Sequence, residues 1–425
     1  MVVNVIGAGL AGVEASYFLA NKGIKVKLFE KRPKVKSEAH HTDLFGELVC
    51  SNSLKSKKLD NACGLLKEEI SNMGSLIIEA SKVSEVPSGD SLSVDRDVFA
   101  KYITEKIKNH PNIEVISEDV NDFKDGINII CTGPLTSKGL LDKISNYTSE
   151  KLYSFFDASA PIIYKDSINF DKVYYKSRYN QGDDSYICCP LNKDEYYKLV
   201  EELINAKRSL LHEFDTHYFE GCLPLEVMAS RGKDTLRFGP LKPTGLEHNG
   251  IFPYAVVQLR QDDLIGDFYN LVGFQTNLTY GEQKRVFSLI PGLENAKFAR
   301  YGLMHRNSYV LAPKVLNDDL SLKNNPDIYI AGQLSGVEGY VESAATGLLA
   351  AYYVYLRLNK KDFKKLSFYT ILGALVRYIT HTGSKNFAPM NSTFGIIYRG
   401  NVDSKEIVIK RSLDNIDSFI KQLDE

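Results

Sequence analysis

The sequence predicts an α/β protein in which a Rossmann-type domain is interrupted by a smaller mixed α/β insertion domain. Its first thirty residues follow the pattern strand, glycine-rich turn, helix, strand. A strand, a glycine turn and a long helix of small residues return over 327–358. Between these parts, short segments rich in tyrosine and phenylalanine alternate with turns. We therefore expect a first part of the nucleotide-binding domain over 1–154, the insertion domain over 155–320, and the second part with a C-terminal segment over 321–425.

The bulk composition is that of a water-soluble globular protein. A chain of 425 residues is longer than a single hydrophobic core usually organises, which favours two domains. Hydrophobic residues make up 44% of the chain and charged residues 25%. The formal net charge of −1 provides no overall field that would attract RNA or an anionic membrane. Any contact with RNA must therefore use local basic patches.

The sequence also predicts a cytoplasmic location. The first apolar run begins at Val2 with no basic region before it, unlike a signal peptide. The longest apolar run, 346–356, is too short to span a bilayer. The six cysteines have neither C-x-x-C pairs nor the regular spacing of a disulfide framework, which favours free thiols in a reducing compartment. We expect no membrane contact.

The N-terminal elements form a β-α-β unit. Residues 2–9 read as a β-branched strand, 10–22 carry apolar side chains at helical spacing, and 24–30 alternate as a second strand. Such a unit begins a parallel doubly wound sheet. Further along, 66–81 has the pattern of one helix, and 112–117 and 126–134 have the pattern of strands.

The turn between the first strand and the first helix carries a dinucleotide fingerprint, G-x-G-x-x-G. Gly7 permits the tight turn, Gly9 lets backbone approach a pyrophosphate, and Gly12 allows the helix to pack closely on the strand. The phosphates would lie at the helix N-terminus, where free N–H groups and the helix dipole favour an anion. Glu30 ends the second strand, where a carboxylate can hold the ribose hydroxyls. The predicted contacts are Gly7, Gly9, Leu10, Ala11, Gly12 and Glu30.

A second glycine turn favours FAD over NAD or S-adenosylmethionine. FAD-dependent members of this architecture return near the C-terminus with a strand, glycines and a helix whose N-terminus faces the flavin. The segment IYIAGQLSGVEGY (328–340) fits this pattern, and IICTGP (129–134) resembles a strand ending of such flavoproteins. We therefore predict a Rossmann-type FAD-binding domain with further contacts at Gly133, Gly332, Gln333, Gly336 and Val337.

Cys222 precedes a short predicted helix. Pro224 suits its first turn and Gly232 its C-terminal stop. A thiol at a helix N-terminus has a lowered pKa and forms thiolate more readily. Arg231 and Arg237 would add to this effect if the chain folds back. The alternative is that Cys222 is a small buried hydrophobic residue.

The segment HHTDLFGELVCSNSL (40–54) has no clean period, and three interpretations remain open from its residues alone: a metal site, a catalytic loop or a polar crossover. His40, His41, Asp43 and Cys50 are metal-ligand types, but adjacent histidines rarely point the same way and no second ligand pair exists. We expect no metal. Hydrogen bonds that fix the loop are the simpler role for the two histidines.

Several segments together resemble the folate-dependent, flavin-using tRNA uridine-5-methyltransferase family, TrmFO. The resemblance runs from Val2 to about Gly395 and implies a GidA/TrmFO-like FAD domain with an insertion. The matching segments are VNVIGAGLAGVEA, AHHTDLFGELVCSNSL, VPSGDSLSVDRDVF, YFEGCLPLEVMASRG, LRFGPLKPTGLEH, PYAVVQLRQDD, IPGLENAKFARYGLMHRN, GQLSGVEGYVESAATGLLA and FAPMNSTFG.

The resemblance implies the chemistry of both thiols. Uridine C5 is a poor nucleophile until a thiolate adds to C6, and the family's nucleophilic cysteine matches Cys222. Its second active-site cysteine, a proposed general acid/base for the C5 proton, matches Cys50. The carbon donor is 5,10-methylenetetrahydrofolate, reduced FAD supplies the hydride, and NADPH or NADH reduces the FAD again. The 40–54 segment would then be an active-site loop.

Basic residues adjoin both thiols and are candidates for RNA binding. Lys55 and Lys58 follow Cys50, and Arg231 and Arg237 follow Cys222. Ordinary solvated side chains are the alternative for each of them. The target uridine would have to leave its stack to reach the flavin. Two further candidates near the flavin are His305 and Arg306.

Departures from the family pattern leave the RNA substrate open. Ser16 and Ser159 replace usual alanines, and Cys188-Cys189-Pro190 replaces an Asn-Cys-Pro. Some family members from small bacteria with AT-rich genomes methylate 23S rRNA instead of the tRNA T-loop. The sequence therefore favours neither tRNA nor 23S rRNA as the substrate.

We expect no obligate protein partner. The alternatives are a non-catalytic FAD-containing RNA-binding or folding factor, and another tRNA-modifying flavoenzyme. A flavin disulfide reductase is disfavoured because no C-x-x-C or C-x-x-x-x-C motif lies near the first helix.

Overall fold

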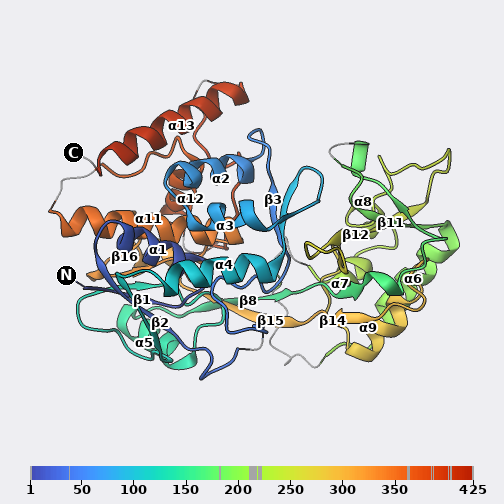
Figure 1. The fold of residues 1–425 in the computed structure, drawn as a ribbon, viewed down its shortest axis with the longest axis horizontal. Coiled ribbons are helices and arrows are strands. Elements are labelled where there is room, and N and C mark those ends of the chain that lie inside the picture. Colours follow the sequence, from blue (N-terminus) through green and yellow to red (C-terminus); the bar gives the residue numbers. More distant parts are fainter. Residues whose placement is uncertain are drawn as a thin grey trace.

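Two six-stranded sheets, each with its own hydrophobic core, organise the chain (Figure 1). The structure is a computed structural model. It describes residues 2–37, 39–180, 183–209, 218, 223–360, 364–383, 385, 387–400, 402 and 404–423.

The first sheet is parallel except for its edge pair β16–β17. Its central strands are buried almost without interruption because helices cover both faces. The sequence-predicted strands over 2–9, 24–30, 112–117, 126–134 and after residue 326 are confirmed. In spatial order the strands are β16 (Ser321–Leu322), β17 (Asn325–Ile330), β7 (Ile127–Ile130), β1 (Val2–Ile6), β2 (Lys25–Glu30) and β6 (Ile113–Ser117).

Two long helices pack against each other on this sheet. Helix α1 (Leu10–Asn21) lies along α11 (Tyr340–Leu358), and the rings of Phe18 and Tyr352 stack with centroids 4.1 Å apart. Both helices begin directly after glycine turns at the carboxyl ends of their strands, as the sequence predicts. This part also contains α4 (Arg96–Lys108), α5 (Lys138–Thr148) and α10 (Ala312–Val315).

The predicted single helix over 66–81 is wrong, because the structure has two helices there. Helix α2 (Ala62–Asn72) ends before Gly74, whose φ of 82° lies in the left-handed region that stops a helix. Ser75 then caps α3 (Leu76–Ser84) by accepting the N–H of Ile78 at 3.2 Å. The apolar spacing continues across the break, which is why the periodicity alone indicated one helix.

A small antiparallel sheet follows the 40–54 segment. Its three strands lie in the order β3 (Ser53–Ser56), β5 (Ser91–Val94) and β4 (Glu85–Val86). Strand β3 thus begins three residues after Cys50 and fixes one end of that loop.

The second sheet is antiparallel and belongs to the insertion, so the predicted change of architecture is confirmed. Its strands in spatial order are β10 (Tyr174–Tyr175), β11 (Ile187–Leu191), β12 (Ala255–Gln261), β13 (Phe268–Leu271), β9 (Ile162–Tyr164) and β14 (Phe298–Arg300). Its helical elements are η1 (Lys165–Ser167), η2 (Arg178–Asn180), α6 (Lys193–Asn205), α7 (Leu225–Ser230), α8 (Thr235–Phe238) and α9 (Tyr280–Phe287).

A two-stranded antiparallel ribbon runs between the two sheets (Figure 1). It consists of β8 (Tyr153–Ala158) and β15 (Met304–Tyr309). After β17 the chain passes through η4 (Gln333–Ser335) and α11 to α12 (Ile371–His381) and α13 (Lys405–Lys421), which both pack on α2. None of the helices in the described ranges has the length and apolar character needed to cross a membrane.

Candidate active site

A first cavity, with about 1000 Å³ of empty space, opens at the carboxyl ends of β1, β2 and β7. It is the crevice in which doubly wound sheets bind nucleotides. Eight residues predicted from the sequence to bind the cofactor line it: Gly7, Gly9, Leu10, Ala11, Glu30, Gly133, Gly332 and Gln333.

The glycine turn leaves room for an anion at the N-terminus of α1. A Cβ on Gly9 would meet no atom within 4 Å, so the backbone there is open to a ligand. No side chain caps the helix at Gly9, which leaves its first N–H groups available. A Cβ on Gly12 would lie 1.8 Å from the carbonyl oxygen of Gly7, so Gly12 serves close packing. The turn therefore fits a dinucleotide pyrophosphate.

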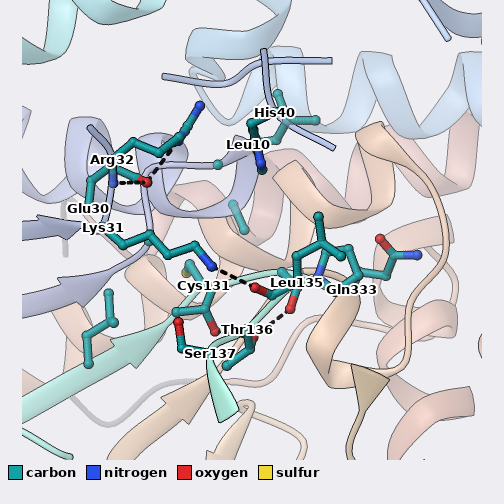
Figure 2. A pocket seen from close by; sticks show the side chains of 18 of the residues that line it. Leu10, Glu30, Lys31, Arg32, His40, Cys131, Leu135, Thr136, Ser137 and Gln333 are labelled. Carbon is teal, nitrogen blue, oxygen red and sulfur yellow. Dashed lines mark hydrogen bonds and ion pairs between the residues drawn. The ribbon is translucent and has the colours of Figure 1, made fainter. Parts of the chain in front are cut away.

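Glu30 is held ionised at the end of β2 (Figure 2). Its Oε2 accepts the N–H of Ala8 at 2.9 Å, and its Oε1 accepts Nε and N–H of Arg32 at 2.9 and 3.0 Å. Burial raises the pKa of the Glu30 carboxyl, but the charge and hydrogen bonds of Arg32 outweigh burial and hold the pKa below its ordinary value. A carboxylate offers about four acceptor positions, so ribose hydroxyls can still bind it.

Lys31 and Arg32 also line the first cavity, although no pattern in the sequence indicated a role for them. The Nζ of Lys31 donates to the carbonyl of Leu135 at 2.9 Å and so bridges the cavity wall (Figure 2). Their position directly after Glu30 is the signal that could have identified them.

Gly336 and Val337 lie outside the lining of the first cavity. A Cβ on Gly336 would meet the ring of Phe387 at 2.5 Å, and Val337 is buried and bridged to Met390. Both residues shape the turn before α11, whereas Gly332 and Gln333 of the same turn line the cavity.

A second cavity, with about 1010 Å³ of empty space, adjoins the first. The two share five lining residues: Val49, Pro134, Gln333, Tyr340 and Ser343. Cys50, Lys55 and His305, all predicted from the sequence, meet in the second cavity although they come from distant segments. A cofactor that extends from the first cavity into the second would therefore end beside the Cys50 loop.

The backbone at Cys50 is held by a tyrosine hydroxyl. The N–H groups of Cys50 and Ser51 donate to the Tyr340 oxygen at 2.8 and 3.0 Å. The Cys50 thiol donates to the carbonyl of Ala158, with 3.6 Å between sulfur and oxygen. Burial, and then the negative charge of Asp157, raise the pKa of the Cys50 thiol well above its ordinary value. Cys50 is therefore a neutral thiol in this arrangement, suited to carry a proton.

Arg96, at the start of α4, fixes the carbonyls of the Cys50 loop. It donates to the carbonyls of Leu48 at 2.7 Å and of Cys50 at 3.4 Å. Its Nε and Nη2 also bind Asp262, just after β12, in a buried ion pair of 3.0 Å. The part that carries the parallel sheet and the insertion are thus joined directly beside the Cys50 loop.

Arg260 makes the second such link. From β12 it donates to the Ser51 hydroxyl at 2.7 Å and to the Asn52 side-chain oxygen at 2.9 Å. Arg96, Arg260 and Asp262 lie in segments that match the family, but no local pattern distinguished them. Sequence reasoning missed them because their partners are more than forty residues away.

The second cavity also holds an acidic pair, Asp157 and Glu338. Burial and the negative charge of Asp157 raise the pKa of the Glu338 carboxyl to about 8. The amide of Gln333 donates to Glu338. His305 Nε2 lies 3.9 Å from Asp157. At neutral pH the cavity therefore contains one carboxylic acid able to donate a hydrogen bond.

The structure does not bring Arg306 into either cavity. Residues of β15 alternate, so His305 faces inward while Arg306 is exposed and donates to the Ser154 hydroxyl at 2.8 Å. The expected place of Arg306 beside the flavin is therefore not supported, because strand alternation turns its side chain away.

The four basic RNA candidates have different surroundings. Lys55 lies 3.4 Å from Glu342 in the second cavity, and Lys58 pairs with Asp90 at 2.6 Å. Arg237 stacks on Tyr254, with its guanidinium carbon 3.7 Å from the ring centre, and donates to the Tyr254 carbonyl. Arg231 is exposed at the end of α7. Of the four, Lys55 is the one that lines either of the two cavities described above.

Cys222 lies outside the described residues. The helix predicted after it is α7, which begins at Leu225, with Pro224 directly before it. The N–H of Leu225 donates at 2.7 Å to the carbonyl of Gln275, a residue that lines the second cavity. The described chain three residues after Cys222 is thus bound to a wall of that cavity.

The histidines of the Cys50 loop make hydrogen bonds. His40 Nδ1 pairs with the Ser37 hydroxyl, and the His41 N–H donates to Glu47 at 2.8 Å. Within the described ranges, no three histidine, cysteine or acidic side chains are grouped to hold a metal ion.

Comparisons with known proteins agree with this geometry. The family described as "Glucose inhibited division protein A" matches residues 2–362. Proteins named "Methylenetetrahydrofolate–tRNA-(uracil-5-)-methyltransferase TrmFO" match over nearly their whole length. The one from Ligilactobacillus salivarius is 49% identical over 98% of each chain, and the one from Listeria monocytogenes is 50% identical over 99% of each. The structure of Aquifex aeolicus GidA has a TM-score of 0.71 at 17% identity and covers 98% of this chain and 73% of that one, which confirms the fold.

Proposed function

Since this chain belongs to the glucose inhibited division protein A family and to the TrmFO enzymes, we propose that it transfers a one-carbon unit from 5,10-methylenetetrahydrofolate to C5 of a uridine in tRNA. The product is 5-methyluridine. The observation that carries this proposal is the placement of Cys50 in a cavity that adjoins a dinucleotide-binding crevice.

FAD fits the first cavity by the residues present. The open backbone at Gly9 and the uncapped N-terminus of α1 would hold the pyrophosphate, and Glu30 would hold the ribose. The turn at Gly332 and Gln333 would lie beside the part that enters the second cavity. When bound and reduced, FAD supplies the hydride that completes the methyl group. NADPH or NADH is the proposed source of that hydride.

The two cysteines have different tasks in this proposal. The Cys222 thiolate adds to uridine C6, the electron pair moves to the C4 oxygen, and C5 becomes able to form the new carbon–carbon bond. Loss of the C5 proton then breaks the bond between the transferred carbon and the folate nitrogen and releases tetrahydrofolate, and addition of hydride to the resulting methylene group lets the Cys222 thiolate leave from C6. Support for its position comes from Leu225, which is bound to the cavity wall only three residues later, a span of at most about 11 Å.

Cys50 is the proposed carrier of the C5 proton. Its thiol is neutral and points to the Ala158 carbonyl, and its backbone is fixed by Tyr340 and Arg96. The raised pKa keeps the free thiol protonated, and the thiolate, once that proton has been given up, is a strong base that can take the C5 proton. Glu338 in its neutral form adds a hydrogen-bond donor to the same wall.

The proposed substrate is tRNA because the TrmFO relatives carry tRNA in their names. The experiment uses purified protein with FAD, methylenetetrahydrofolate and NADPH, incubated separately with unmodified tRNA and unmodified 23S rRNA. Digestion and mass spectrometry then measure 5-methyluridine in each RNA. We expect the product in tRNA, and its loss in the variants Cys222→Ala and Cys50→Ala.

Two outcomes would change the proposal. 5-Methyluridine in 23S rRNA alone would support the proposed reaction but would replace tRNA by 23S rRNA as the substrate. No product in either RNA, with FAD bound and RNA binding intact, would overturn the catalytic role in favour of a non-catalytic RNA-binding factor. Flavin absorbance measures whether NADPH reduces the bound FAD. This measurement distinguishes a protein whose cofactor site does not work from one that fails only in the transfer of the one-carbon unit to RNA.

A further inference from the structure

A cluster of aromatic rings and arginines lies on the surface near the C-terminus, outside both cavities. We define the C-terminal platform as Phe368, Tyr369, Arg377, Tyr398, Arg399 and Arg411. Its three rings have centroids 5.0 to 5.6 Å apart. Tyr398 is 54% exposed. The platform therefore presents an aromatic side chain to solvent on a rigid base.

Two arginines hold the rings in place. The guanidinium of Arg377 lies 4.7 Å from the ring centre of Phe368, and that of Arg411 lies 4.2 Å from the ring centre of Tyr369. Arg411 also donates to the carbonyls of Tyr398 and Arg399. The segment that carries Tyr398 is thus fixed by α13, and little conformational entropy remains to be lost when a ligand binds.

The platform carries positive charge that no ion pair with an acidic side chain of the described residues neutralises. No carboxylate of the described residues forms an ion pair with Arg377, Arg399 or Arg411, whereas Lys57 and Lys58 pair with acidic side chains at 2.7 and 2.6 Å. Residues 357–425 contain 12 lysines and arginines against 7 acidic residues, in a chain whose net charge is −1. The basic surplus is therefore concentrated in this part, which favours a polyanionic partner.

One short segment connects the platform to the active site. Asn391 lines the second cavity, and the N–H of Ser392 donates to Glu342 at 2.9 Å. Tyr398 follows Asn391 by seven residues, a span of at most about 25 Å. The helices α12 and α13 that carry the platform lie on the same side of the molecule as α2 and β3 (Figure 1).

We propose that the C-terminal platform binds the RNA substrate outside the target nucleotide, with Tyr398 stacking on an unpaired base and Arg377 and Arg399 contacting phosphates. Aromatic side chains bind bases of any sequence in this way, and arginines beside them neutralise the backbone. The proposal rests on the proposed function, because it assigns a second contact to the same RNA. It predicts that binding affinity depends on residues remote from the chemistry.

The test compares two double variants that are matched in residue type and exposure. Tyr398→Ala/Arg399→Gln removes the exposed ring and one unpaired charge of the platform. The control, Tyr280→Ala/Arg285→Gln, changes two residues of α9 in the insertion: a tyrosine that is 51% exposed, and an exposed arginine that pairs with Glu282 of the same helix and with Glu202 of α6. Fluorescence anisotropy measures the Kd for unmodified tRNA over a range of salt concentrations. Methylation assays measure KM and kcat.

We expect the platform variant to raise Kd and KM about tenfold or more, because stacking and a phosphate contact are both lost. The slope of log K against log salt should fall by about one. kcat at saturating tRNA and FAD reduction by NADPH should stay at the wild-type values. The control variant should bind tRNA within about twofold of the wild type.

Three results would overturn the inference. A platform variant that binds and methylates tRNA as the wild type does removes the platform from RNA binding. An equal loss of tRNA affinity in the control variant shows that removal of any exposed tyrosine and arginine weakens RNA binding, so that the platform has no special role. A changed oligomeric state in sedimentation, with unchanged RNA affinity, assigns the platform to a second copy of the chain. A wild-type protein that neither binds nor methylates RNA refutes the proposed function itself, which distinguishes the two failures.

Discussion

The backbone N–H of Cys50 donates to the hydroxyl oxygen of Tyr340 across 2.8 Å. The two residues are 290 positions apart in the chain, and Tyr340 begins the helix α11 that follows the second glycine turn. Because the N–H of Ser51 shares the same acceptor at 3.0 Å, one hydroxyl fixes two peptide groups of the Cys50 loop. The second glycine turn and the Cys50 loop are therefore a single structural unit.

Removal of that hydroxyl should disturb catalysis more than folding. In Tyr340→Phe the N–H groups of Cys50 and Ser51 lose their acceptor, at about 1–3 kcal/mol for a buried unsatisfied group. We expect kcat for methyl transfer to fall about tenfold or more while FAD remains bound. Single-turnover assays and flavin absorbance measure both. Tyr352→Phe is the control, since it removes a buried hydroxyl that donates to the Met73 carbonyl away from the cavities. An equal fall in both variants would contradict the positioning role of Tyr340.

The ion pair of Arg96 and Asp262 should couple the insertion to the active-site loop. Each single variant, Arg96→Met or Asp262→Asn, leaves a buried partner without its counter-charge, which costs about 3–5 kcal/mol. We expect the double variant to lose less than the sum of the two, as measured by urea unfolding. Additive losses would show that the two side chains act independently.

Glu338 should give the methylation rate an ionisation near pH 8. Above that pH the carboxyl loses its proton, and a second negative charge then faces Asp157 and the enolate that forms on the uracil. We expect kcat to decline above about pH 8 in the wild type and not in Glu338→Gln. In Asp157→Asn the decline should move to lower pH, because removal of the neighbouring negative charge lowers the pKa of Glu338. A profile that is the same in all three proteins would exclude Glu338 as the titrating group.

A buried carboxyl should make the folded state less stable as pH rises through the acidic range. Glu14 accepts the N–H groups of Leu76 and Ile77 at the start of α3, and burial raises the pKa of its carboxyl from 4.5 to about 7. The folded state thus keeps a proton that the unfolded chain releases. The stabilising contribution of this proton is complete below pH 4.5 and is lost as pH rises to about 7. Between the two pKa values the loss is about 1.4 kcal/mol for each increase of one in pH.

The measurement is thermal unfolding at several pH values. We expect Glu14→Gln to show a smaller fall in Tm between about pH 5 and 7 than the wild type, because its amide does not titrate. The relevant comparison is the slope against pH within each protein, which is independent of the overall stability of the variant. Parallel slopes would show that Glu14 titrates at its ordinary pKa in the folded protein.

Local sequence determined the elements that depend on backbone geometry. Glycines at fixed spacing between a strand and a helix specify the nucleotide turn, and continuous apolar strands specify a parallel sheet, so β1, α1, β2 and the turn at Gly332 were predictable. The same reasoning failed at Gly74, where one glycine and a capping serine interrupt an apolar period that otherwise continues. Periodicity reports which face of a helix is buried and not whether the helix is continuous.

The sequence by itself determined the fold class and the glycine turns, because each depends on residues close together in the chain, whereas the roles of Cys50 and Cys222 stay predictions. Only the tertiary structure placed the Cys50–Ser51 segment between Tyr340, Arg96 and Arg260, and raised the pKa of Glu338 through burial and the charge of Asp157. Hydrogen bonds and charge interactions act across a few ångströms of space whatever the distance along the chain. A residue's chemistry is therefore decided by neighbours that its local sequence does not contain.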